Sequence, residues 1–440
     1  MSIGFEPMKD GFADRSLRPL GYDTGEEKHI TKMKSHSRVK LIIQKCQFLM
    51  YNLTKEVTMN SQDEKYFKEY EEKYASNVYV AFDKLESFMR DVSISSGVPD
   101  KDAAIISDVL IESDKRGIDS HGIGRLKPIY IDRIDKGILN PVTNIEIVKD
   151  EMACVTIDGH NGMGHVVAHK AMEMAIEKAK KYGIGMSVVR NSTHYGIAGY
   201  YATMATKENM IGLTGTNARP SIAPTFGVEN MMGTNPLTFG LPTDEEFPFV
   251  LDCATSVSQR GKIEVYGRAG KELPPGWVIG EDGKTRTDTK QVLEDLTNGK
   301  AALTPLGGIG EETAGYKGYG YAAVVEILSA ALQGGSYMKM LNGKDENGKA
   351  IPYPLGHFFI AINPSFFMGE ELFKYIAGNI CRELRASKTA PGEDRIFTAG
   401  EKEYLAWQFR KEHGCPVPPS LQKVIKDLTE RFKLDYTWSF

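Results

Sequence analysis

Residues 153–191 read ACVTIDGHNGMGHVVAHKAMEMAIEKAKKYGIGMSVVRN and contain two predicted strands around a helix. The run 153–158 is rich in β-branched residues and reads as a strand. Residues 166–183 have apolar side chains at helical spacing and end at Gly183, a typical helix stop. Residues 184–191 again read as a strand. This stretch therefore predicts a strand–loop–helix–strand unit of an α/β domain built around a sheet.

The same alternation continues toward the C-terminus. Further expected elements are a helix at 196–210, strands at 211–217 and 247–255, a polar, turn-rich excursion at 263–300, a buried helix at 318–335 and a last strand at 357–364. No internal repeat or low-complexity tract interrupts them. The middle of the chain is therefore expected to be one α/β domain.

Helical patterns surround this middle part. Residues 78–97, 100–117 and 119–137 each have helical apolar spacing, and charged helices return near the C-terminus. We therefore predict a helical domain formed from both chain ends, with the α/β part inserted. The proposed division is a polar extension of unknown function at 1–75, a terminal, substrate-side domain at 76–150 and 336–440, and a cofactor-binding domain at 151–335.

Composition argues against several classes of partner. The chain has 54 basic and 58 acidic residues and a net charge of −4, which gives no reason to expect nucleic acid or an anionic membrane. Its five cysteines form no C-x-x-C pair, so neither a disulfide framework nor a structural zinc site is expected. The apolar run 41–53 is too short to span a bilayer. A cytoplasmic protein with a small-molecule ligand is the expectation.

The glycine-rich loop at 159–164 does not fit the classical dinucleotide-binding fingerprint. Gly159, Gly162 and Gly164 have G-x-x-G-x-G order instead of G-x-G-x-x-G, and no acidic residue ends a strand about 20 residues later. The loop is better read as a turn that lets a helix pack closely on a sheet. A classical Rossmann fold is therefore not predicted.

The octapeptide D-S-H-G-I-G-R-L at 119–126 carries the clearest chemistry. His121 and Arg125 are four positions apart, so on a helix they would share one face. A planar guanidinium is a preferred bidentate partner of a carboxylate, and an imidazole titrates near neutrality. An acid one turn from a carboxylate clamp is what reduction of a 2-oxo acid requires, and Ser120 is placed to orient the imidazole.

This octapeptide, followed by Tyr130, Arg133 and Gly137, resembles the signature of the type-2 malate/L-lactate dehydrogenases. These are NAD(P)-dependent reductases of 2-oxo and imino acids that differ from the Rossmann enzymes. The likeness extends from about Val78 to the C-terminus through NSTHYGIAGYY (191–201), MGTNPLTFGLP (232–242), LDCATS (251–256), RGKI (260–263), PLGG (305–308), GYKGYGYA (315–322) and PGE (391–393). So many motifs in one order are more specific than any single one.

The resemblance implies catalytic and substrate-binding roles. His121 matches the family's proton donor, Ser120 its relay partner and Arg125 the residue that binds the substrate carboxylate. His194 matches a histidine assigned as the proton acceptor in some members, so it is the rival catalytic residue.

The resemblance also implies a cofactor, a fold and an assembly. The cofactor is NAD, with NADP possible, and the fold is a mixed-sheet, non-Rossmann α/β fold in a homodimer. The implied nucleotide contacts are His194, Tyr195, Gly196, Ile197, Ala198, Thr234, Asp252, Cys253, Ala254, Lys317, Pro391, Gly392 and Glu393.

Two further cations are candidate substrate contacts. Lys262 matches a position that is aspartate in the imino-acid-reducing members, and a lysine there favours an oxo acid because a cation opposes a protonated imine. Arg133 is a candidate for the second carboxylate of a dicarboxylate, although a solvent-facing helix charge is an equal reading. The expected reaction is malate/oxaloacetate or lactate/pyruvate interconversion, with ureidoglycolate, sulfolactate and diketogulonate as other possible substrates.

Two readings from other classes compete. His160, His165 and His169 would serve a metal-dependent hydrolase, although the H-E-x-x-H pattern is absent because Val166 follows His165. A non-catalytic binding protein is the third reading, and the intact Ser120, His121 and Arg125 argue against it. The dehydrogenase reading predicts no bound metal.

Overall fold

The computed structural model describes residues 61–440 of the chain. The expected extension at 1–75 therefore lies largely outside the described residues, as does Cys46, and its last part forms helix α2 (Ser61–Tyr74). Between residues 61 and 440, no helix is both long and apolar enough to cross a membrane.

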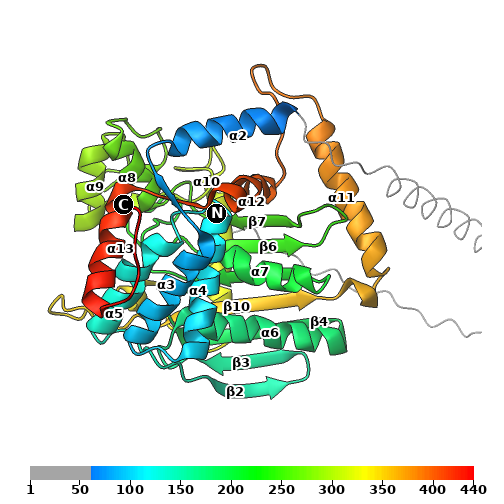
Figure 1. Ribbon diagram of the computed structural model, residues 1–440, viewed down its shortest axis with the longest axis horizontal. Helices are drawn as coiled ribbons and strands as arrows, with labels where there is room; N and C mark the ends of the chain where they lie inside the picture. Colours follow the sequence, from blue (N-terminus) through cyan, green and yellow to red (C-terminus); the bar gives the residue numbers. More distant parts are fainter. Residues whose placement is uncertain (1–60) are drawn as a thin grey trace, which may run out of the picture. The chain divides into compact units, whose positions relative to one another are not determined.

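A seven-stranded mixed sheet lies at the centre (Figure 1). Its strand order is β2-β3-β4-β10-β5-β6-β7, and β3 and β4 pair in parallel while the other neighbours are antiparallel. The bounds are β2 (Glu146–Glu151), β3 (Cys154–Asp158), β4 (Ile184–Ser192), β5 (Ile211–Thr216), β6 (Leu237–Leu241), β7 (Phe249–Cys253) and β10 (Leu355–Ile362). The predicted mixed, non-Rossmann sheet is confirmed, because a Rossmann sheet is mostly parallel.

Helices cover both faces of this sheet. Along β10, Phe358 packs with Val325 of α10 (Gly315–Leu328), whereas Phe359 packs with α6 (Gly164–Tyr182) and α7 (Ala198–Lys207). Successive side chains of a strand point to opposite faces, and both phenylalanines are buried. A continuous apolar run therefore marks β10 as a central strand, although the sequence analysis assigned it to the terminal domain.

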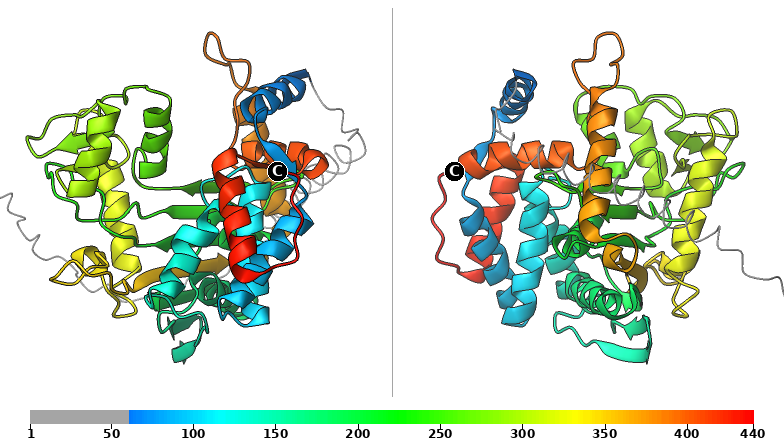
Figure 2. Two further views of the ribbon diagram at one scale, coloured as in Figure 1. Left: turned by 60° about the vertical axis from the view of Figure 1, so that its left-hand side comes forward. Right: turned by 90° about the vertical axis from the view of Figure 1, so that its right-hand side faces the viewer.

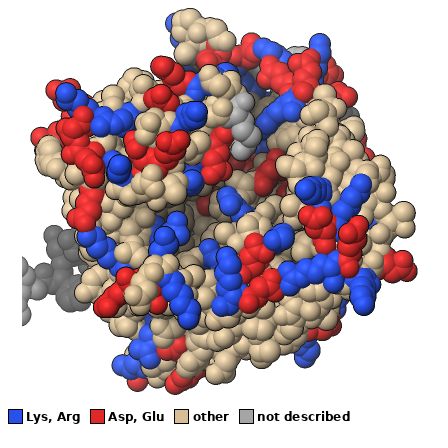
Figure 3. All heavy atoms as spheres, turned by 90° about the vertical axis from the view of Figure 1, so that its left-hand side faces the viewer, with Lys and Arg blue, Asp and Glu red and all other residues tan. Residues whose placement is uncertain are grey.

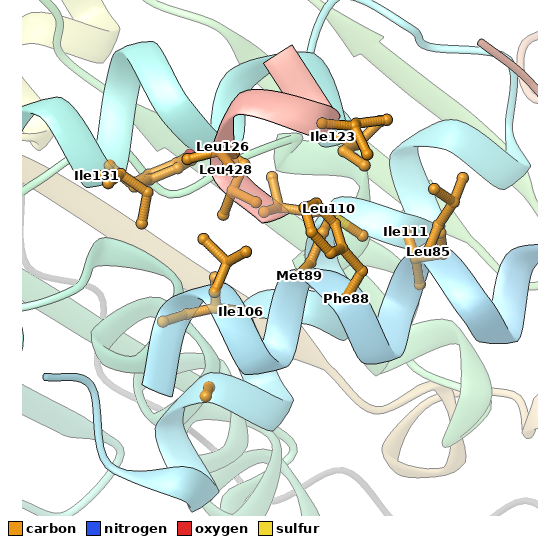
Figure 4. Packing of buried hydrophobic residues seen from close by; sticks show 14 of the residues in the cluster. Leu85, Phe88, Met89, Ile106, Leu110, Ile111, Ile123, Leu126, Ile131 and Leu428 are labelled. Carbon is orange, nitrogen blue, oxygen red and sulfur yellow. The ribbon is translucent and has the colours of Figure 1, made fainter. Parts of the chain in front are cut away.

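The terminal domain joins the two ends of the chain, as predicted. Strand β1 (Val78–Val80) pairs with β11 (Cys415–Val417), and α3 (Phe82–Ser95), α4 (Asp100–Lys115) and α13 (Pro419–Phe432) share one core (Figure 4). Phe88, Met89, Leu110 and Leu428 are among its buried residues. Helix α12 (Glu401–His413) lies between α4 and α2.

The interpretation of 263–300 as a polar excursion was wrong. This region forms most of a small lobe with α8 (Arg260–Arg268), β8 (Val278–Gly280), α9 (Thr289–Asn298) and β9 (Ala301–Leu303), visible on the left of Figure 2. Val292 and Leu303 belong to its own core, and the Asp288 carboxylate caps α9 by accepting the Gln291 amide at 3.0 Å. Apolar residues are sparse in this part of the sequence and stand among many charged ones, so the pattern did not indicate a core.

Two helices expose apolar faces. The predicted buried helix at 318–335 is α10, and Tyr321, Val324 and Ile327 on it are exposed. Helix α11 (Glu370–Ala386) lies across the ends of β10, β6 and β7 (Figures 1 and 2) and exposes Ile376, Ile380 and Leu384. The expectation that α10 is buried was therefore right for one of its faces.

Candidate active site

The segment 119–122 is not helical, contrary to the prediction for 119–137. A 3₁₀ turn (Ile123–Arg125), a π-type turn (Leu126–Ile131) and a short α5 (Asp132–Asp135) follow it. Pro128 has no amide N–H to bond the carbonyl of residue 124, which breaks a regular α-helical ladder. Arg125 still lies near His121: its Nε donates a hydrogen bond to the carbonyl oxygen of Ser120, and its charge acts on the imidazole.

Ser120 orients His121. Its Oγ lies 2.8 Å from Nδ1 of the imidazole. Because this nitrogen is engaged, Nε2 is the atom that remains for a ligand.

The second histidine stands face to face with the first. The rings of His121 and His194 are stacked, with centroids 5.8 Å apart and planes inclined by 17°. The hydroxyl of Tyr130 lies 2.6 Å from Nδ1 of His194, and the amide of Gly196 donates to the same nitrogen at 3.3 Å. An amide can only donate, so Nδ1 is an acceptor and the neutral ring carries its proton on Nε2.

The surroundings keep both imidazoles neutral at pH 7. Burial and then the charge of Arg125 lower the pKa of His121 to about 4. Burial, followed by the neighbouring His121 and His165, holds the pKa of His194 well below its ordinary value. Strongly shifted histidines of this kind are typical of functional sites as well as of cores.

Two arginines complete the group. The positive charges of Arg125 and Arg133 both act on His194. The guanidinium of Arg133 lies 4.8 Å from the ring centroid of Tyr353. The structure therefore brings together Ser120, His121, Arg125 and His194, and the charge of Arg133 also acts on His194.

Tyr130 is a member of this site that the sequence analysis quoted without giving it a role. Burial raises the pKa of its hydroxyl, which therefore stays protonated and available to His194. Its position nine residues after His121 follows no general spacing rule. Tyr353 lies far away in the sequence, and no local signal identifies it.

The predicted cofactor contacts after β4 are followed by a glycine, Gly199, that is bound to a partly buried carboxylate. Asp252 on β7 accepts the Gly199 amide at 2.7 Å and the Thr238 hydroxyl at 3.0 Å. It thus holds the start of α7, which directly follows Tyr195, Gly196 and Ile197 and begins at Ala198. Burial raises the pKa of Asp252. The neighbouring Cys253–Ala254 segment lies beside Thr234, whose carbonyl accepts the Thr255 amide at 3.0 Å.

The start of α10 is tightly wrapped by the preceding loop. The loop 305–310 wraps so closely around it that a Cβ on Gly315 would lie 2.1 Å from the Gly308 carbonyl oxygen. Lys317 is exposed in the first turn of this helix. A helix N-terminus with a cation beside it suits an anion.

Two predicted contacts lie on other elements. Lys262 is exposed on α8, where its ammonium lies 4.8 Å from the ring centroid of Trp277. The turn Pro391–Gly392–Glu393 is exposed after α11, next to α2 (Figure 1). Residues directly after this turn, Asp394 and Arg395, form ion pairs with α2.

The three histidines proposed for a hydrolase each contact a different residue. His160 contacts Glu146 at 2.8 Å, His165 packs 4.6 Å from the Tyr130 ring, and His169 lies 3.4 Å from Glu173. Within residues 61–440, no group of three or more potential ligands is arranged to hold a metal ion. This competing reading is not favoured.

His165 predicts a specific pH dependence of stability. It is fully buried, and neither ring nitrogen has a hydrogen-bond partner among residues 61–440. Burial lowers its pKa to about 3, so on acidification the unfolded chain takes up a proton near pH 6.5 that the folded chain refuses. His165 therefore costs up to about 1.4 kcal/mol of stability per pH unit as the pH falls from 6 to 4.

Urea unfolding at pH 4, 5 and 6 measures this effect. Between pH 6 and pH 4, the free energy of unfolding of His165→Phe should fall less steeply than that of wild type, by up to about 1.4 kcal/mol per pH unit. This difference in slope does not depend on how the substitution changes stability at pH 7. His160→Gln, at a partly exposed ring, is the control and should keep the wild-type slope. Equal slopes for wild type and His165→Phe would contradict the assignment.

The face on the left of Figure 1 is hollowed, and both basic and acidic side chains lie around the hollow (Figure 3).

The chain is similar to known proteins in both sequence and structure. The family model described as malate/L-lactate dehydrogenase matches residues 80–426. The chain is 42% identical over 363 residues to a malate dehydrogenase of Pyrococcus horikoshii, covering 82% of this chain and 97% of that protein. It is 39% identical to an L-sulfolactate dehydrogenase of Methanocaldococcus jannaschii, covering 78% and 94%. A crystal structure of malate dehydrogenase from Entamoeba histolytica superposes with a TM-score of 0.79 at 44% identity, covering 82% of this chain and 100% of that one.

Proposed function

The chain belongs to the malate/L-lactate dehydrogenase family, and on this premise we propose that it interconverts a 2-hydroxy acid and a 2-oxo acid with NAD(H) or NADP(H). The observation that carries the proposal is the Ser120–His121 pair beside Arg125. It combines an oriented imidazole with a carboxylate-binding cation in one partly buried site.

In the reducing direction, Arg125 binds the carboxylate of the oxo acid and thereby orients the ketone. Nε2 of His121 donates a proton to the ketone oxygen, and in the oxidising direction it accepts the proton of the hydroxyl group. The nicotinamide cofactor supplies or accepts the hydride when bound. Lys317 and the start of α10 would hold its phosphates, and residues 195–198 would be further contacts of the cofactor.

Substrate binding adjusts the acid in this scheme. The positive charge of Arg125 lowers the pKa of His121 in the free enzyme. A bound carboxylate neutralises this charge, so the pKa of His121 rises when the oxo acid binds. The proton needed for reduction is therefore taken up together with the substrate.

His194 is assigned a supporting role. Its Nδ1 accepts hydrogen bonds, and its pKa is held far below neutrality. A neutral ring with its proton on Nε2 can donate a hydrogen bond to the substrate but is a poor proton acceptor at that atom. This leaves His121 as the acid and base.

A dicarboxylate is the proposed substrate class, with malate/oxaloacetate preferred over lactate/pyruvate. Arg133 acts on the same histidine as Arg125 and provides the second cation. The similar proteins named malate and sulfolactate dehydrogenase support this preference, because both compounds carry a second acidic group.

The assembly and location are also proposals. The exposed apolar faces of α10 and α11 support a homodimer, because large apolar patches on a single chain usually mark interfaces. The scattered cysteines support a cytoplasmic location.

Lys262 tests the preference for oxo acids over imines. Lys262→Asp should increase the ratio of cyclic-imine to oxo-acid reduction by roughly tenfold, because an anion replaces a cation near a protonated imine. Lys271→Asp, a charge reversal after the end of α8, is the matched control. Competition assays with both substrates measure the ratio, and an unchanged ratio would remove Lys262 from the substrate site.

Absorbance at 340 nm tests the function as a whole. Purified protein should oxidise NADH or NADPH with oxaloacetate faster than with pyruvate. If the protein consumes neither NADH nor NADPH with any 2-oxo acid of three to six carbons, the proposed reaction is refuted.

A further inference from the structure

Helix α2 precedes the family match, which begins at residue 80, yet it packs against the domain that carries His121. Tyr70 and Tyr74 are buried against Phe409 and Ala406 of α12. Tyr66 lies one turn earlier on the same side. In Figure 1, α2 lies beside α12.

The aromatic face of α2 encloses a buried cation. Arg410 of α12 is fully buried, and its guanidinium lies 5.5 Å and 5.1 Å from the ring centroids of Tyr70 and Tyr74. Its Nε donates a hydrogen bond to the Tyr70 hydroxyl at 2.6 Å. A buried guanidinium needs partners for its charge and its N–H groups, because an unpaired buried charge is costly.

The anion that Arg410 pairs with is Asp119, the residue directly before Ser120. Nη1 and Nη2 of Arg410 donate hydrogen bonds to Oδ1 and Oδ2 of Asp119 at 2.6 Å and 3.1 Å. The hydroxyl of Tyr74 donates to Oδ2 at 2.7 Å. Burial and the nearby Asp119 raise the pKa of Tyr74, so the hydroxyl stays protonated.

The other end of the segment is also held. The Ile123 amide donates to Oδ2 of Asp114 at 2.8 Å. A Cβ on Gly122 would lie 1.9 Å from Oδ1 of the same carboxyl group, so only glycine allows this close approach. Residues 119–123 are therefore fixed on both sides of His121.

We infer that Tyr74 of α2 is a positioning residue for the reaction: with Arg410 it fixes Asp119 and so sets the orientation of the Ser120–His121 pair toward His194. The catalytic role of His121 rests on the proposed function, whereas the contacts that hold Asp119 do not. Small errors in the placement of a catalytic group lower rates strongly. Helix α2 is thus part of the catalytic apparatus although it touches no reacting atom.

The test compares Tyr74→Phe with Tyr66→Phe in the full-length protein. Both changes remove one hydroxyl from α2, but the Tyr66 hydroxyl donates to the Lys402 carbonyl at 3.3 Å and not to Asp119. Hydrogen–deuterium exchange of the amides in 119–123 and the kcat and KM for the oxo acid are measured for each. Tyr74→Phe should speed exchange there at least tenfold and lower kcat about tenfold with little change in KM. Tyr66→Phe should change neither.

A shift in the pH profile separates positioning from general destabilisation. In a loosened segment the His121 imidazole is more exposed to water, which raises its pKa. The acid limb of the pH profile for hydroxy-acid oxidation should therefore move from near pH 4 toward the ordinary pKa of histidine. Tyr70→Phe, which removes the acceptor of Arg410 Nε, should shift exchange, kcat and the limb in the same directions.

Exchange in Tyr74→Phe that equals exchange in Tyr66→Phe would overturn the inference. Faster exchange with unchanged kcat and pH profile would overturn it as well, because the segment would then be held without consequence for His121. If the wild-type protein reduces no oxo acid, the proposed function fails, and exchange alone then decides whether Tyr74 holds the segment.

Discussion

Replacing His121 by glutamine is expected to lower kcat for oxo-acid reduction by roughly 10²–10⁴-fold, the usual contribution of a positioned general acid. Glutamine keeps a hydrogen-bonding side chain of similar length but cannot deliver a proton. The dissociation constant of NADH, measured by fluorescence titration, should stay within about twofold, because the proposed role of His121 is proton transfer.

His194→Gln is the matched comparison for this variant. It should lower kcat less than His121→Gln, because His194 is proposed to donate a hydrogen bond and not a proton. The reverse order of the two effects would transfer the catalytic assignment to His194.

The pH dependence provides a second signature of His121. In hydroxy-acid oxidation the imidazole must be neutral to accept a proton, so kcat/KM should be level above pH 5 and fall as the pH drops through about 4. Reduction requires the protonated form and should be favoured by acid. An acid limb that persists in His121→Gln would belong to another group.

Replacing Arg125 by glutamine should lower kcat/KM for every 2-oxo acid by about 100-fold or more, equivalent to about 3 kcal/mol of lost transition-state binding. Most of the loss should appear in KM, because the guanidinium binds the carboxylate in both the ground state and the transition state. The acid limb attributed to His121 should also move upward, since the cation that lowers its pKa is gone.

Arg133→Gln separates the two arginines. If Arg133 binds the remote carboxylate, this change should raise KM for oxaloacetate at least tenfold and leave KM for pyruvate nearly unchanged. An equal loss for both substrates would show that Arg133 acts on the shared part of the substrate. An unchanged KM for pyruvate in Arg125→Gln would refute the carboxylate clamp itself.

Local patterns predicted the elements of the fold better than their order in the sheet. The strands at 153–158 and 184–191 and the helix between them have their expected type, because one apolar face and a glycine stop suffice to specify them. The place of β10 between β4 and β5 depends on contacts between residues far apart in the chain. The mixed topology therefore came from the family resemblance and not from periodicity.

The candidate site shows the same division. The spacing of His121 and Arg125 pointed to both residues, although the helix expected to join them is absent and Arg125 instead donates a hydrogen bond to the carbonyl of Ser120, the neighbour of His121. The fold alone brings in three further residues: Tyr130, Tyr353 and Arg410. A single tyrosine or arginine has no sequence pattern that would identify it. Residues 119–122 lack regular structure, and the contacts of Asp119 and of the Ile123 amide hold this segment in place of a helical ladder.

The central position of β10 also governs how the chain assembles during synthesis. Strands β4 and β5 leave the ribosome well before residues 355–362, so each keeps one edge without its partner until about the last fifth of the chain appears. Non-local pairing of this kind slows folding and exposes partly folded chains to association. A nascent chain of this protein should therefore depend on chaperones until β10 inserts, and a chain truncated before Leu355 should aggregate even though its histidine pair is complete.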